Sequence, residues 1–292
     1  MSIAVLIGVH DGLVLASDSA STLMITAAPN LAGIANVYDN TNKIFNLYKG
    51  KSIGCIAYGA GSIGNSSIGT LIKDLRVKLT DGELGFDPDK YTMEQVANIL
   101  VDFLGSECQK QNPAVQVTLN IGLLLGGYSA GESLGETWML EINAGKPNKP
   151  KLARPSDQPG ITWGGAGEVI QRIVLGFSPA LFEVLASVAG PPQAGQPAAT
   201  ADQLRNQLNP LLLSKLQAGL VFAPMPIQDT IELARFLVHA AIMFSRFLPG
   251  PQIVGGPIEI ASITKHEGFK WISRKHYYDQ SLNREPIHVI ID

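Results

Sequence analysis

A serine stands at position 2, directly before an apolar, β-branched run that begins at Ile3. Chain ends fray unless something ties them down, so a strand that starts this early needs an explanation. One interpretation is that the first strand simply begins at the edge of the core. The other is that Ser2 becomes the first residue once Met1 is removed and is itself the reactive group. This second interpretation predicts a hydroxyl nucleophile at the N-terminus.

Several other catalytic signatures are missing from the sequence. It has no Walker loop and no HxxxH or HxH pair among its five histidines, so a metal hydrolase has little support. The cysteines Cys55 and Cys108 lie far apart without metal-ligand spacing, and we expect buried structural thiols. The GxG pieces at 59–61 and 165–167 are more typical of packing or turns than of phosphate binding. We expect neither a metal nor an organic cofactor.

Length and composition exclude several classes of protein. The chain has 292 residues, 46% hydrophobic and 16% charged, with a formal net charge of −3. We favour a single domain over 1–292. No uninterrupted apolar run reaches the roughly 18 residues needed to cross a bilayer, and no basic stripe interleaved with aromatic residues is present, so neither a membrane nor a nucleic acid is an expected partner. A charged HDG turn interrupts the first apolar residues, so no secretory signal is recognised and a cytoplasmic location is expected.

The front of the chain predicts four strands. Apolar runs at 3–9 and 13–16 flank a His-Asp-Gly turn, which is typical of a hairpin. A second pair, at 43–48 and 52–59, flanks a Lys-Gly-Lys turn. Between the two pairs, the polar and small residues of 19–40 predict a long irregular stretch.

The rest of the chain alternates helical and strand-like groups. Apolar residues recur at helical spacing within 62–79 and more strongly within 91–111, where Thr92 is a candidate N-cap. The later predicted elements are strands at 118–128, 136–145, 151–154 and 161–165, a helix at 168–188, a helical segment at 202–220 broken at Pro210, a helix at 230–248, and strands at 257–268 and 269–276. This order predicts an α+β chain with antiparallel sheets stacked between helices.

A helical insertion and a tail complete the expected organisation. Residues 189–201 are rich in Pro, Gly and Ala and predict an exposed linker. Linker and helical insertion together are expected at about 188–228, and a polar C-terminal tail at about 276–292.

Several stretches resemble a proteasome β-type subunit of the N-terminal-nucleophile hydrolase superfamily. They are, in chain order, SIAVLIGVHDGLVLASDS, TNKIFNL, SIGCIAYGAG, LLLGGY, TWMLEI, ITWGGAGEVI and GGPIEIASITKHEG. The resemblance covers most of the chain except the insertion and the tail. It implies a four-layer αββα sandwich.

The resemblance also implies the site residues. The family's nucleophile is the first residue of the mature chain, with its own α-amine as general base, and it falls on Ser2. The family's acidic residue after the second strand falls on Asp18, and its lysine before the next strand falls on Lys43. A lysine ammonium near the chain end favours the neutral amine, and a carboxylate holds that lysine in place. Each of the two residues could alternatively be a turn-closing aspartate or an edge lysine with no role in catalysis.

The oxyanion donor implied by the family is a backbone N–H near Ala57, and we expect Tyr58 or Gly59 to supply it. Several supporting positions depart from the family. At positions where the family usually has hydroxyl or acidic side chains, this sequence has Gly165, Ala166, Gln252 and Gly255.

The function expected from this resemblance is a peptidase. Ser2 would cleave peptide bonds of peptides or unfolded proteins inside a self-compartmentalising homo-oligomer, a ring or a helical assembly, and whether an unfoldase ATPase docks on it stays open. Two alternatives remain: an inactive assembly scaffold that keeps the fold, and a hydrolase of the same superfamily that acts on a small-molecule amide.

Overall fold

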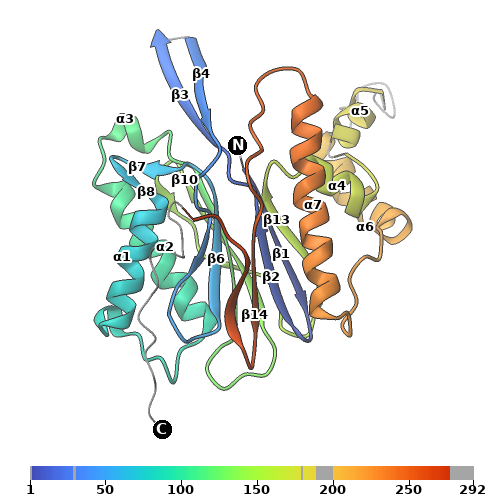
Figure 1. Cartoon of the computed structure of the whole chain (residues 1–292). Helices are drawn as coiled ribbons and strands as arrows, with labels where there is room; N and C mark the ends of the chain where they lie inside the picture. Colours follow the sequence, from blue (N-terminus) through green and yellow to red (C-terminus); the bar gives the residue numbers. More distant parts are fainter. Residues whose placement is uncertain (1, 29–30, 179, 189–199, 277–292) are drawn as a thin grey trace.

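Two antiparallel sheets form the centre of the molecule (Figure 1). The computed structural model describes residues 2–28, 31–178, 180–188 and 200–276. One sheet consists, in spatial order, of β13 (Gly160–Gly165), β1 (Ile3–Val9), β2 (Gly12–Ser17), β14 (Glu259–Thr264) and β15 (Gly268–Ser273). The other consists, in spatial order, of β11 (Lys146–Pro147), β10 (Glu136–Asn143), β9 (Ile121–Gly127), β6 (Ile53–Gly59) and β5 (Ile44–Asn46). Strand β12 (Lys151–Arg154) also pairs with β10.

Helices lie on the outer faces of both sheets (Figure 1). Those beside the sheet of β6 and β9 are α1, α2 and the short α3, at Ile68–Thr80, Met93–Gln109 and Pro113–Gln116, with a 3₁₀ turn at Glu83–Gly85. Helices α4 and α7, at Glu168–Leu175 and Ile227–Phe247, pack on the sheet of β1 and β2, and α5 and α6, at Ala180–Val188 and Ala201–Leu216, lie farther out. The chain is therefore mixed α/β with antiparallel sheets, in agreement with the predicted class.

Strand β1 has no polar residue because both of its faces are covered. Ile3, Val5 and Ile7 pack in the cluster that includes α4 and α7, whereas Ala4 and Leu6 pack in the cluster between the two sheets. Side chains alternate along a strand, so β1 needs apolar residues at every position because both of its faces are covered. The predicted hairpin of β1 and β2 is confirmed.

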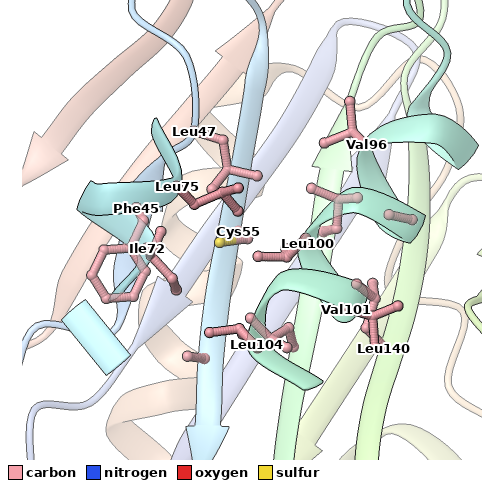
Figure 2. Packing of buried hydrophobic residues seen from close by; sticks show 14 of the residues in the cluster. Phe45, Leu47, Cys55, Ile72, Leu75, Val96, Leu100, Val101, Leu104 and Leu140 are labelled. Atoms are coloured by element: carbon pink, nitrogen blue, oxygen red, sulfur yellow. The ribbon is translucent and has the colours of Figure 1, made fainter. Parts of the chain in front are cut away.

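A second cluster packs α1 and α2 onto β6 and its neighbours. Thr92 caps α2, as predicted, by accepting a hydrogen bond from the Gln95 N–H at 3.2 Å. Figure 2 shows Leu100 and Leu104, four residues apart on α2, beside the strand that carries Cys55. Both cysteines are free and buried, and burial raises the pKa of each thiol, as expected for structural cysteines.

The irregular stretch predicted for 19–40 is wrong. Ser21–Ala28 and Leu31–Tyr38 form strands β3 and β4, which pair with each other alone and project away from the two main sheets (Figure 1). The frequent Ala, Asn and Gly residues lower the β-propensity of this segment and concealed the pattern. A second small hairpin, β7 and β8 at Ser62–Ile63 and Ser66–Ser67, precedes α1.

The single helix predicted over 168–188 is also wrong. Gly176 adopts φ = 82° and its N–H bonds the Arg172 carbonyl, a left-handed cap that ends α4 before α5 begins. Conversely, α6 continues through Pro210, where a break was expected. Within the described residues no single helix is long and apolar enough to cross a membrane, whereas α4 and α5 taken together, bent by 77°, pass the same test of length and composition.

The expected linker lies mostly at 189–199 and the expected tail at 277–292, both outside the described residues. Helix α6 falls within the expected insertion, and the domain boundaries stay predictions.

Replacing Leu100 by Ala should reduce the free energy of unfolding by about 2–5 kcal/mol, because the side chain is fully buried and its loss leaves a cavity. Urea-induced unfolding measures the change. Val77→Ala, at a 56% exposed position on α1, is the control and should change stability by less than about 0.5 kcal/mol. Equal losses in both variants would contradict the packing described.

Candidate active site

The Asp18 carboxylate lies at the centre of the site and is fully buried. Its Oδ1 accepts from the Ile3 N–H at 3.0 Å and from the Lys43 ammonium at 2.5 Å. Its Oδ2 accepts from the N–H groups of Ala20 at 3.1 Å and Gly255 at 3.0 Å. These donors belong to the start of β1, the residues after β2, the segment before β14 and the residue before β5. One side chain thus connects both sheets.

Lys43 directly precedes β5 and is 4% exposed. Its carbonyl accepts from the Ala57 N–H at 2.9 Å, which ties it to β6. Burial holds the pKa of the Lys43 ammonium below its usual range, and the neighbouring Asp18 partly offsets this effect. The structure therefore brings Asp18 and Lys43 together as a buried ion pair.

Ser2 is buried at the start of β1, on the same side of the strand as Ala4 and Leu6, which face the second sheet. Its carbonyl accepts from the Ala166 N–H at 2.7 Å. Gly165 adopts φ = 84°, and a Cβ at that position would collide with the Ser2 carbonyl oxygen. Position 165 therefore has no room for a hydroxyl-bearing side chain.

The Tyr58 ring turns into the space between the sheets. A Cβ on Gly122 of β9 or on Gly164 of β13 would collide with the Tyr58 ring, so these two glycines make room for it. Burial, with a smaller contribution from Glu141, raises the pKa of Tyr58 to about 12. The phenol therefore stays neutral at physiological pH.

The backbone replaces a side chain at another departure from the family. Gly255, which offers no hydroxyl, donates its N–H to Asp18 instead. Gln252 does not reach the carboxylate, because its Nε2 donates to the Val254 carbonyl at 3.0 Å. The segment before β14 thus supports Asp18 through its main chain.

A second buried ion pair, absent from the sequence-based expectations, lies beside the first. Lys275 Nζ is 2.9 Å from Glu259 Oε2, and it also donates to Ser19 Oγ at 2.7 Å and to the Thr41 carbonyl at 2.9 Å. Glu259 is 1% exposed, at the start of β14. A glutamate at the start of an otherwise largely apolar strand could have indicated this pair from the sequence, since buried carboxylates are almost always paired with a cation.

Lys275 of the second pair bonds the segments that carry Asp18 and Lys43. Ser19 follows Asp18, and its N–H donates to the Gly255 carbonyl at 2.8 Å. Thr41 precedes Lys43, and its N–H donates to the Ser19 carbonyl at 3.0 Å. The positive charge of Lys275 also lowers the pKa of Lys43.

A cleft of about 840 Å³ opens beside Ser2. Four of the five predicted site residues line it: Ser2, Lys43, Tyr58 and Gly59. Asp18 lies behind Lys43. Other parts of the wall come from the base of the β3–β4 hairpin, from α1, and from Thr118, Asn120 and Ile253. Among the described residues, no group of three His, Cys, Asp or Glu side chains is placed to hold a metal ion.

No protein-family model and no curated protein matches this sequence. Solved structures do match in fold. Anbu (ancestral β-subunit) from Yersinia bercovieri gives a TM-score of 0.52 at 15% identity, covering 94% of this chain and 89% of that one. An Anbu (Gly-1) mutant from Hyphomicrobium sp. strain MC1 gives 0.51 at 14% identity, covering 97% and 92%. The predicted resemblance to a proteasome β-type subunit is confirmed at the level of the fold.

Gly122→Ala should destabilise the protein by about 1–3 kcal/mol, because the new methyl group overpacks the Tyr58 ring. The same substitution in a Tyr58→Ala background should cost clearly less, and a double-mutant cycle in urea measures the difference. Gly33→Ala, whose Cβ meets nothing within 4 Å, is the control. Additive effects at 122 and 58 would refute the contact.

Lys275→Met should destabilise the protein by about 3–5 kcal/mol, because it leaves the Glu259 carboxylate buried without a cation. Adding Glu259→Gln should recover much of that loss. Lys78→Met removes one partner of an exposed ion pair with Glu83 and should cost about 1 kcal/mol or less. A Lys275→Met protein as stable as Lys78→Met would show that the second pair carries no structural role.

Proposed function

We propose that this chain is an N-terminal-nucleophile hydrolase that cleaves peptide bonds with Ser2 after Met1 has been removed. The observation that carries the proposal is the Asp18 carboxylate, which bonds both the Ile3 N–H and the Lys43 ammonium. It holds a buried cation beside the residue that becomes the chain end. The proteasome-like fold supports the assignment, and we interpret the two sheets between helices as the αββα sandwich of that superfamily.

Each group has a role in the proposed reaction. The Ser2 hydroxyl attacks the carbonyl carbon of the scissile bond while its proton passes to the free α-amine of the same residue, whose ordinary pKa is about 7.7 to 8.0. The amine then protonates the leaving nitrogen as the C–N bond breaks, which leaves an ester on Ser2. Water hydrolyses this ester with the amine again as base. The Lys43 ammonium favours the neutral amine, and Asp18 positions Lys43.

Strand alternation favours Gly59 over Tyr58 as the oxyanion donor. Along an antiparallel strand, successive N–H groups point to opposite sides. The Ala57 N–H points toward Lys43, which it bonds, so the Gly59 N–H leaves β6 on the same side, beyond the start of β5. We therefore assign the oxyanion to the Gly59 N–H and give Tyr58 a packing role.

We further propose that the chain works as a homo-oligomer, a ring or a helical assembly. Three phenylalanines on α7 support this, because Phe236, Phe244 and Phe247 are 53%, 36% and 76% exposed. Peptides or unfolded proteins are the proposed substrates.

One observation favours an inactive assembly scaffold as the second candidate. Gly165 cannot carry a side chain, so the hydroxyl that the family places near the chain end has no counterpart at this position. The test of the first candidate also decides between the two.

The test is the intact mass of the purified protein before and after incubation with a peptide epoxyketone. Loss of Met1 and one adduct per chain are expected, because the reagent reacts with a nucleophilic N-terminal residue. Ser2→Ala should form no adduct and Ser2→Thr should restore it. Ser21→Ala, which removes another hydroxyl that lines the cleft, is the matched control and should react like the wild type. Retained Met1 with no adduct would overturn the hydrolase and favour the scaffold.

A further inference from the structure

A second hollow continues from the cleft at Ser2. It has a volume of about 360 Å³ and lies between β5, α1 and the segment at β15. Asn42 and Lys73 line both this hollow and the cleft, so the two form one surface. Its cationic residues define what we name the basic groove: Lys49, Lys73, Arg76 and Arg274.

The charge of the basic groove is not balanced by its surroundings. Glu259 is the only carboxylate among the described residues that line it, and Glu259 is already paired with Lys275. Within the described part of the chain, the four cationic side chains of the groove make no hydrogen bond or ion pair. The whole protein carries a net charge of −3, so this local excess of positive charge does not follow from its composition.

The floor of the groove orients one of these cations. The Arg274 guanidinium lies 4.7 Å from the centre of the Trp271 ring, a cation–π contact that leaves its N–H donors available. Phe45 and Ile72, both buried, also line the groove and add apolar surface to it. A planar guanidinium held in this way suits a carboxylate, which it can bind through two parallel hydrogen bonds.

The cleft at Ser2 has the same sign of charge. Among its described lining residues, no carboxylate lines the cleft; Lys43 is paired with Asp18, so the unpaired charge comes from Lys73. A peptide that enters the cleft and extends past Lys73 toward Arg274 therefore meets unpaired cations, and the one carboxylate among the described residues that line this path, Glu259, is already paired with Lys275.

We propose that the basic groove binds Asp and Glu side chains of the peptide whose scissile bond lies at Ser2, so that acidic peptides are the preferred substrates. This inference rests on the proposed function for its substrate but concerns a binding site separate from the nucleophile. Continuity with the cleft and complementary charge favour an acidic peptide as the occupant.

The experiment measures binding without catalysis. A fluorescein-labelled, ten-residue Glu-rich peptide and its Gln counterpart are titrated with full-length Ser2→Ala protein, and fluorescence anisotropy gives the affinities. The Glu peptide should bind about tenfold more tightly at low salt, and the preference should shrink as salt screens the charges. Equal binding of the two peptides would overturn the proposal.

Matched variants locate the binding. The triple variant Lys49→Gln, Arg76→Gln, Arg274→Gln should lose most of the preference for the Glu peptide. The control Lys146→Gln, Lys149→Gln, Lys151→Gln removes the same charge near β11 and β12, far from β5 in the strand order, and should keep it. If the triple variant does not fold, Lys49→Glu with Arg274→Glu alters only exposed side chains. Equal losses in groove and control variants would overturn the proposal.

Two further outcomes separate the hypotheses. An oligonucleotide that binds the groove more tightly than the Glu peptide would overturn the assignment to peptide. The binding assay uses the Ser2→Ala protein and does not depend on catalysis. If the wild type fails to react with the epoxyketone but the Glu peptide still binds, the hydrolase proposal is rejected and the peptide-binding groove is retained. The reverse result would reject the groove alone.

Discussion

The interaction on which the site depends is the buried Asp18 carboxylate with its four donors. A carboxylate removed from water must regain its lost hydrogen bonds within the protein, and this one does so through three backbone N–H groups and the Lys43 ammonium. The donors lie far apart in sequence, so satisfying this single charge fixes the start of β1, the exit of β2, the approach to β14 and the entry to β5. The position of Ser2 follows, because the Ile3 N–H is one of the donors.

Two buried ion pairs stand side by side where many folds would have apolar contacts. Removing each ion from water costs several kcal/mol, roughly, and a buried pair is seldom more stabilising than well-packed hydrophobic residues. The presence of both pairs, Asp18–Lys43 and Glu259–Lys275, therefore indicates that charge is needed beside Ser2 for a reason other than stability. Asp18 and Lys43 supply the charge beside Ser2, while Glu259 and Lys275 fasten the loops through Ser19 and help to lower the pKa of Lys43.

The main chain replaces side chains that the family resemblance led us to expect. Gly255 supports Asp18 through its N–H, and the Ala166 N–H bonds the Ser2 carbonyl. Backbone donors need no rotamer to be fixed once the strands are in place. In this chain, whose fold matches solved structures at 14–15% identity, main-chain groups thus hold Asp18 and the Ser2 carbonyl.

The sequence by itself determined the strands and helices whose patterns are local. The β1–β2 hairpin, the Thr92 cap and the long apolar α7 could be predicted because spacing and capping chemistry act over a few residues. The resemblance in short motifs then indicated Ser2, Asp18 and Lys43. Only the tertiary structure decided that β3 and β4 pair apart from the main sheets, that Tyr58 turns between Gly122 and Gly164, and that Glu259 meets Lys275. These features depend on contacts between segments distant in the chain, which no local pattern encodes.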